Sequence, residues 1–89
     1  MLLELNDNVI FQQEDEYNSF FINLLEGQYI YNNETSTKII TLLLESNQFI
    51  DVIDNLSSTF NVECSILEKD VHELITLWCD LGLIKKVNL

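Results

Sequence analysis

The spacing of apolar residues changes at Asn33 and divides the chain into a strand-forming part and a helix-forming part. Before Asn33, residues 20–25 carry an apolar set with a period of two, and residues 9–11 and 29–31 are rich in β-branched and aromatic types. A period of two is typical of strands, and a pair containing Gly27 between two such runs favours a hairpin. The first third therefore predicts an antiparallel meander of three strands.

From Asn33 onward the apolar residues recur at helical spacing, which predicts three helices. Asn33 can cap the first helix, residues 49–60 carry the stripe of the second, and Gly82 is placed to end the third. Ser65 and Glu68 have the spacing of a capping box at the start of the third helix. The residues of this helix expected to point inward are Leu67, Val71, Leu74, Ile75, Trp78 and Leu81.

This order of elements predicts an α+β fold of winged-helix character, with a three-stranded antiparallel sheet followed by three helices. Hydrophobic residues make up 47% of the chain and charged residues 21%, a balance that favours folding over disorder. We expect one face of the sheet to pack on the three helices and residues 83–89 to form a short extended tail. Residues 1–89 are expected to form a single domain.

The charge balance excludes several classes of function. Fifteen acidic residues against four lysines and no arginine give a formal charge of −11. Such a chain is poorly suited to bind nucleic acid or an anionic membrane, because both need clustered basic residues. Its apolar runs are too short to span a bilayer, and its first residues lack the features of a secretory signal. The expected location is cytoplasmic.

The sequence offers few groups that could carry catalysis or bind a metal. His72 is the only histidine, and Thr76 stands where a zinc-protease helix needs its second histidine. Cys64 and Cys79 are expected to be free thiols, since fifteen positions along one helix place them ~22 Å apart. The acidic residues 14–16 lack the ligand pattern of a calcium loop. We therefore expect no enzyme activity, no metal and no cofactor.

One segment resembles a known family. Residues 27–36, with the sequence GQYIYNNETS, are similar to a segment of the PqqD family that runs roughly G-R-Y-x-x-L-N-E-T-G. Three positions depart from this pattern. Gln28 replaces an arginine, Asn32 stands where an apolar residue is usual, and Ser36 replaces a glycine.

The helical part of the chain is also similar to the PqqD family. The first predicted helix has apolar residues at the positions where the family has them. Residues 49–60 resemble the family's second helix. The third carries the Asp70-Val71 pair and ends in Gly-Leu-Ile at residues 82–84. The resemblance covers about residues 9–86 and rests on the order, spacing and length of the elements together.

The resemblance implies the function of a RiPP recognition element, a domain that binds the leader segment of a ribosomally made precursor peptide. Members are non-catalytic adaptors that present the peptide to a tailoring enzyme, such as a radical-SAM protein, a leader peptidase or a cyclodehydratase. In the family, the leader adds as an extra strand beside the third strand, in the groove that this strand forms with the third helix.

The residues themselves support such a mechanism. In a meander, residues 29–31 form an edge strand, whose unpaired N–H and C=O groups an extended peptide can use. The apolar arc of the third helix is also wider than the covering of one sheet face requires. The expected peptide-binding residues are Gln28, Tyr29, Ile30, Tyr31, Asn32, Ile66, Asp70, Glu73, Leu74 and Leu77.

Simpler roles for these residues stay open at this point. Tyr29 and Tyr31 share a sheet face and could be core residues, with Ile30 pointing away from the helices. Ile66 and Leu77 could contact the second helix or the C-terminal tail. Asp70 and Glu73 could be solvated charges, although they could also meet a basic leader residue, and the charge of −11 would favour leaders with Lys or Arg.

A second interpretation comes from a different class of protein. The predicted fold is also that of winged-helix transcription regulators and of general protein-interaction modules. The acidic composition counts against DNA. A homodimer formed by pairing of exposed edge strands is a further alternative, and it would block the proposed site.

Overall fold

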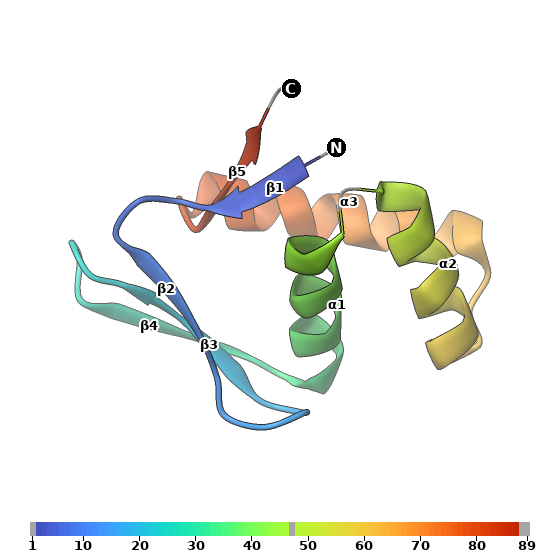
Figure 1. Ribbon diagram of the computed structural model, residues 1–89, viewed down its shortest axis with the longest axis horizontal. Helices are drawn as coiled ribbons and strands as arrows, with labels where there is room; N and C mark the ends of the chain where they lie inside the picture. The colour runs from blue at the N-terminus through green and yellow to red at the C-terminus, as the bar shows by residue number, and fades with distance from the viewer. Residues whose placement is uncertain (1, 47, 88–89) are drawn as a thin grey trace.

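Residues 2–46 and 48–87 form two small sheets and three helices (Figure 1). The computed structural model describes residues 2–46 and 48–87. Within this part, no helix is long and apolar enough to cross a membrane. The elements in order are β1 (Leu2–Leu5), β2 (Val9–Gln13), β3 (Ser19–Asn23), β4 (Gln28–Asn32), α1 (Glu34–Glu45), α2 (Phe49–Phe60), α3 (Cys64–Asp80) and β5 (Ile84–Val87).

The predicted three-stranded meander is confirmed. β2, β3 and β4 are adjacent in that order and antiparallel. Phe21 lies at the centre, opposite Phe11 of β2 and Ile30 of β4, and its side chain is completely buried. Because side chains alternate along a strand, these three residues share the inner face of the sheet.

The turn between β3 and β4 is longer than predicted. β3 ends at Asn23, and residues 24–27 form a four-residue turn. The side-chain oxygen of Asn23 accepts hydrogen bonds from the backbone N–H groups of Leu25 (3.1 Å) and Glu26 (3.2 Å). Such local bonds satisfy backbone donors outside the strand ladder, so they end the strand two residues early.

The start of α1 is where the sequence predicted it, whereas the start of α3 is not. Asn33 caps α1 as predicted, its side-chain oxygen accepting the N–H of Ser36 at 3.0 Å. The predicted capping box at Ser65 is wrong, because α3 already begins at Cys64. The Glu63 carbonyl accepts the N–H of Leu67 at 3.1 Å, which places Ser65 inside the first turn.

The end of α3 is set by Gly82, as predicted. Gly82 has a φ of 74°, a left-handed conformation that favours glycine. Its N–H donates to the carbonyl of Cys79 (3.0 Å), and the N–H of Leu83 donates to the carbonyl of Trp78 (2.9 Å). This is the Schellman pattern of hydrogen bonds. It leaves Leu81 on the outside, 48% exposed, so the prediction that Leu81 points inward is wrong.

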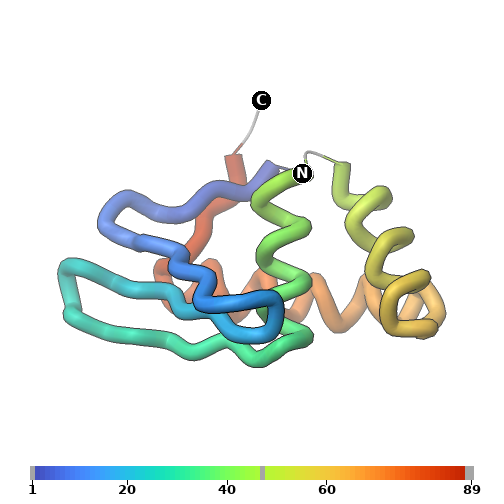
Figure 2. The backbone as a smooth tube through the Cα atoms, turned by 60° about the horizontal axis from the view of Figure 1, so that its bottom comes forward, coloured from blue at the N-terminus to red at the C-terminus, as the bar shows by residue number. Residues whose placement is uncertain are grey.

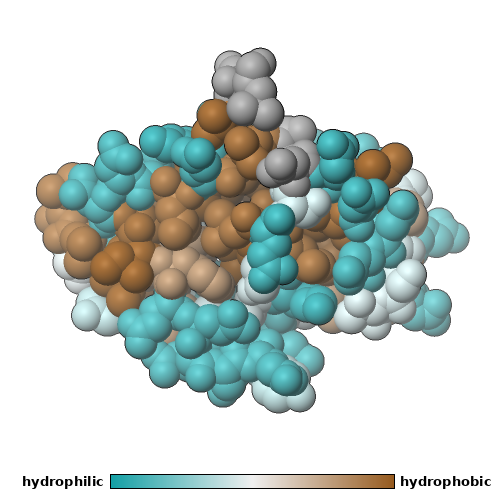
Figure 3. All heavy atoms as spheres, in the orientation of Figure 1, coloured by the Kyte–Doolittle hydropathy of each residue, from teal (hydrophilic) through white to brown (hydrophobic). Residues whose placement is uncertain are grey.

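The core lies between the inner face of the β2–β4 sheet, the β1–β5 pair and the helices (Figures 1 and 2). α2 packs mainly on α1 and α3, so the expectation that one sheet face packs on all three helices is wrong for α2. On the face drawn in Figure 3, hydrophobic atoms gather across the centre and left, and hydrophilic atoms cover the turn between β2 and β3. The largest fully buried side chains are Phe21, Ile40, Leu56, Ile75, Leu83, Ile84, Val52 and Val71.

The second sheet joins the two ends of the described chain and was not predicted. β1 and β5 pair antiparallel, with Leu2 opposite Val87 and Leu5 opposite Ile84. The expected extended tail is therefore a paired strand as far as Val87, and residues 88–89 lie outside the described part. Leu3 and Ile84 are buried in the common core, and this burial explains why two strands of only four residues form a stable pair here.

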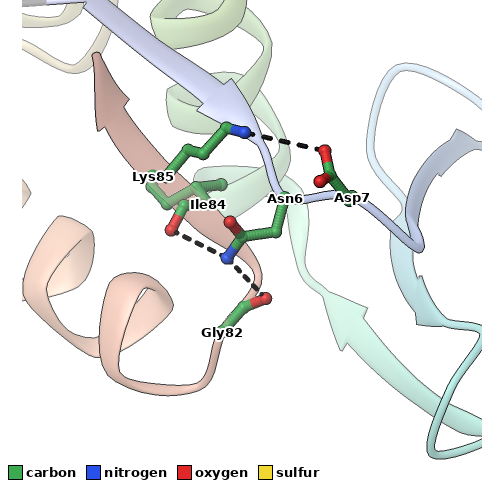
Figure 4. A network of polar contacts seen from close by, with 5 residues as sticks. All are labelled: Asn6, Asp7, Gly82, Ile84 and Lys85. Atoms are coloured by element: carbon green, nitrogen blue, oxygen red, sulfur yellow. Dashed lines mark hydrogen bonds and ion pairs between the residues drawn. The ribbon is translucent and has the colours of Figure 1, made fainter. Parts of the chain in front are cut away.

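Asn6 fastens β1 to the end of α3 (Figure 4). Its side-chain amide donates to the carbonyl oxygens of Gly82 (2.8 Å) and Ile84 (3.4 Å), and its backbone N–H donates to the Leu83 carbonyl at 3.0 Å. An ion pair between Lys85 Nζ and Asp7 Oδ1 at 3.6 Å lies close by on the exposed surface. These hydrogen bonds from Asn6 thus satisfy the carbonyl groups of the segment that follows α3.

We predict that Asn6→Ala lowers the free energy of unfolding by about 1 kcal/mol, because the Gly82 carbonyl loses its side-chain donor. Urea denaturation followed by tryptophan fluorescence measures this change through Trp78. Asn55→Ala is the matched control, since the Asn55 side chain only accepts a 3.3 Å bond from Thr59 on the surface of α2. Equal stability of the two variants would contradict the role given to Asn6.

Candidate peptide-binding surface

β4 is an edge strand, as predicted for residues 29–31. It pairs with β3 on one side only. On the free side of an antiparallel edge strand, alternate residues direct their N–H and C=O groups away from the sheet. β4 has the sequence QYIYN and contains neither the lysine nor the proline that commonly protects an edge. Its free edge can therefore accept another strand.

The two faces of β4 have different surroundings. Ile30 is half-buried and packs against the core, whereas Tyr29 is 71% and Tyr31 55% exposed on the opposite face. The alternative that the tyrosines are core residues is therefore wrong. Phe21 opposite Ile30 already fills the inner face, so the register places the tyrosines outside. A peptide that packs on the inner side of the edge would meet the side chain of Ile30 and only the backbone of Tyr29 and Tyr31.

Asn32, at the end of β4, is buried with 3% exposure. Its carbonyl accepts a bond from the Thr37 hydroxyl at 3.2 Å, and Thr37 Oγ1 lies 2.8 Å from Ser19 Oγ. Asn32 Nδ2 has no hydrogen-bond partner among the described residues. The backbone carbonyl of Asn32 thus belongs to a small polar cluster with Thr37 and Ser19, whereas its side-chain amide group does not take part. Gln28, at the other end of the strand, is exposed.

The expected peptide-binding residues of α3 lie along one side of that helix. At about 100° per residue they fall within one arc of the helix, and these residues are Ile66, Asp70, Glu73, Leu74 and Leu77. Ile66 is 51% and Leu77 52% exposed, and Leu74 is half-buried at the border of the core. The alternative contact of Ile66 and Leu77 with α2 does not account for them, because α2 contacts the other side of α3. There the rings of Phe49 and His72 lie 4.7 Å apart.

The contact between Phe21 and Trp78 sets the position of β4 relative to α3. The two rings meet edge to face, with centroids 5.6 Å apart. Trp78 is buried, as predicted. In Figures 1 and 2, the C-terminal half of α3 lies beside the sheet and its N-terminal half beside α2. Leu74 and Leu77 belong to the half beside the sheet, whereas Ile66 lies about 16 Å further along the helix axis from Leu77.

The structure adds Leu81 to this surface. It follows α3 at 48% exposure, on the same side as Leu74 and Leu77. Helical periodicity assigned Leu81 to the core, because the pattern does not show that α3 ends at Asp80. Gly82, which ends the helix, is the residue from which the exposure of Leu81 could have been predicted.

The other candidate chemical groups do not assemble into a site. Cys64 and Cys79 are free thiols, as predicted. Within residues 2–46 and 48–87, no three His, Cys, Asp or Glu side chains are grouped to hold a metal ion. The acidic residues 14–16 form an exposed turn. There the pKa of Asp15 is lowered, because its carboxylate accepts the backbone N–H of Tyr17 at 2.7 Å and bonds from Asn18.

Two surface depressions lie away from β4. One of about 460 Å³ lies between the acidic turn, α1 and the end of α2, and includes Glu34, Thr37 and Lys38. Another of about 230 Å³ lies between α2 and the start of α3, with Ile50 and Ile53 among its walls. Both are open surface hollows that lack an arrangement of catalytic groups. The free edge of β4 and the exposed apolar side of α3 are thus the features of this region that the sequence predicted and the structure contains.

Two solved structures have the same fold. One is described as "TbiB1 in Complex with the TbiA(beta) Leader Peptide"; it is 17% identical, with 97% of this chain and 99% of that chain covered and a TM-score of 0.84. The other is described as "Lasso peptide synthetase B1 complexed with the leader peptide"; it is 23% identical, with 97% and 100% covered and a TM-score of 0.86. No curated protein is similar enough in sequence to count as a match.

The sequence itself matches a family model. The model is described as "Coenzyme PQQ synthesis protein D (PqqD)", and the match extends over residues 7–84. It begins just before β2 and ends at the start of β5, so it includes the meander, all three helices and every residue of the candidate surface. The chain belongs to the PqqD family.

Proposed function

We propose that this protein is a non-catalytic adaptor for ribosomally made peptides, a single winged-helix-like domain that binds the precursor's leader and presents it to a tailoring enzyme. The leader adds as an antiparallel or parallel strand at the free edge of β4. The observation that carries this proposal is the free edge of β4, in a sheet whose central residue Phe21 packs on Trp78 of α3, the helix with the exposed apolar side. The two structurally similar proteins were solved with leader peptides, which supports it.

Strand addition explains how such a surface can bind a peptide without a deep pocket. The backbone of β4 supplies hydrogen bonds that any extended sequence can make. Selectivity then comes from side chains that reach Ile30, Leu74, Leu77 and Leu81. Because every second residue of the added strand points to the same side, the proposal predicts leaders with apolar residues at alternate positions.

The charges beside the apolar side of α3 indicate a second element of selectivity. Asp70 and Glu73 are exposed on the same side of the helix as Leu77. A lysine or arginine of the leader can pair with them at the border of the groove. The formal charge of −11 would also speed the approach of such a leader at low salt.

The alternative of a DNA-binding regulator gains no support from the structure. The meander, which would correspond to the wing, has no lysine between Val9 and Asn32. Lys85 pairs with Asp7 across the β1–β5 end of the molecule. A homodimer formed by pairing of two β4 strands would compete with the leader for the same edge. Cytoplasmic residence is a further part of the proposal.

We predict that Leu77→Thr weakens leader binding about fivefold, because one half-exposed leucine loses an apolar contact worth about 1 kcal/mol. Fluorescence anisotropy with a labelled leader, taken from the precursor gene nearest to that of this chain, measures the dissociation constant. Ile50→Thr is the control, since Ile50 is 67% exposed on α2 and also helical. Equal affinities of the two variants for the leader would contradict a role of α3 in leader binding.

We further predict that a leader carrying Lys or Arg binds more weakly as salt rises, because screening acts on exposed charges. The dissociation constant would be measured from about 50 to 500 mM NaCl, a range over which the Debye length falls several-fold. The double variant Asp70→Asn/Glu73→Gln should show a smaller salt dependence than the wild type. Binding of a basic leader that is independent of salt would contradict the electrostatic part of the proposal.

A further inference from the structure

The outer face of the β2–β4 sheet carries an apolar surface that the leader site does not use. The register places Ile10, Ile22 and Tyr29 in one row across the three strands and Phe20 beside Tyr31 in the next. Tyr29 is 71%, Tyr31 55% and Ile10 45% exposed. In Figure 2 the β2–β3 hairpin passes in front of α1 and α3, and α2 lies to one side of it. No described element covers this outer face.

Two contacts hold the Tyr31 ring on this face. The rings of Phe20 and Tyr31 pack with centroids 5.5 Å apart. The Tyr31 hydroxyl donates a hydrogen bond to Asn18 Oδ1, in the turn between β2 and β3. Fixed, exposed tyrosine rings are typical of the centre of a protein interface, since they lose little conformational freedom on binding.

The rim of the face is acidic. Between Val9 and Asn32 the chain has four acidic residues and no lysine. Glu14, Asp15 and Glu16 lie in the turn at one end of the sheet, and Glu26 lies in the turn at the other end (Figure 1). The hydrogen bond from the backbone N–H of Tyr17 lowers the pKa of Asp15, because it favours the charged form of that carboxylate.

The rim decides between the possible occupants. A second copy of the chain on this face would bring two sets of four carboxylates together, and like charges across an interface cost several kcal/mol. An anionic membrane is disfavoured for the same reason. The surface that complements this face has an apolar centre surrounded by Lys and Arg.

We propose that the outer face of the β2–β4 sheet is the docking surface for the tailoring enzyme, which meets it with an apolar patch rimmed by basic residues. This inference rests on the proposed leader-binding function. It gives the adaptor two separate sites on one sheet: the free edge of β4 binds the leader, and the outer face binds the enzyme. The leader strand is then held next to the enzyme, with β4 between the two sites.

The test uses the full chain, the leader from the nearest precursor gene and the purified modifying enzyme encoded beside it. The variant Ile10→Thr/Ile22→Thr changes only the outer face, and Ile50→Thr changes an exposed isoleucine on α2. We expect the double variant to weaken association with the enzyme at least tenfold, measured by calorimetry. Its leader affinity should stay within twofold of the wild type, and Ile50→Thr should change neither.

A second pair of variants tests the rim without touching a packed side chain. Glu14→Lys/Glu26→Lys reverses charges beside the outer face, and Glu45→Lys/Asp51→Lys makes the same change in net charge on α1 and α2. Only the first should weaken association with the enzyme, by about tenfold. This comparison holds even if Ile10→Thr/Ile22→Thr fails to fold.

The outcomes separate the two proposals. Enzyme association that survives both the apolar and the rim variants, or is absent in the wild type, overturns the docking surface while leader binding stands. Loss of leader affinity in Ile10→Thr/Ile22→Thr with the protein folded also overturns it, because the face would then belong to the leader. A wild-type dimer that the same variant dissociates would assign the face to a second copy. A wild type that binds no leader removes the proposed function and this inference with it.

Discussion

The packing of Phe21 against Trp78 is the contact on which the proposed binding surface depends. Phe21 is the central residue of the meander and Trp78 the last large core residue of α3, and both are buried. Aromatic pairs of this geometry add about 0.5–1.5 kcal/mol to the burial of the rings themselves. Because β4 is fixed to β3 by its register, holding Phe21 on Trp78 also fixes the position of β4 relative to α3.

The C-terminal end of α3, directly after Trp78, is also held by a different set of interactions. Gly82 reverses the chain, Asn6 donates to the carbonyl of Gly82, and β5 then pairs with β1. The segment that follows α3 is therefore tied to the segment that precedes β2. A leader that adds to β4 would meet a preorganised surface, which reduces the entropic cost of ordering a peptide-binding groove.

The sequence predicted the elements that local patterns encode and failed where contacts are distant. The meander, the Asn33 cap and the Gly82 stop follow from periodicity and from residues that favour one backbone conformation. The pairing of β1 with β5 joins residues about eighty positions apart, and no local period reveals it. The face of Tyr29 and Tyr31 could not be chosen either, because a strand alternates equally well in both directions until Phe21 defines the core side. For the candidate surface, spacing grouped the α3 residues correctly on one side but misplaced Leu81, since the end of the helix decides its exposure.

Amide hydrogen exchange of β4, measured by NMR with and without leader peptide, tests the central claim most directly. Strand addition would protect alternate amides of residues 28–32, those that point away from β3, because they gain hydrogen bonds to the peptide. The amides of β2, at the opposite edge of the sheet, should be unchanged. Saturating leader that leaves β4 exchange unaltered, or that protects β2 instead, would contradict binding at this edge.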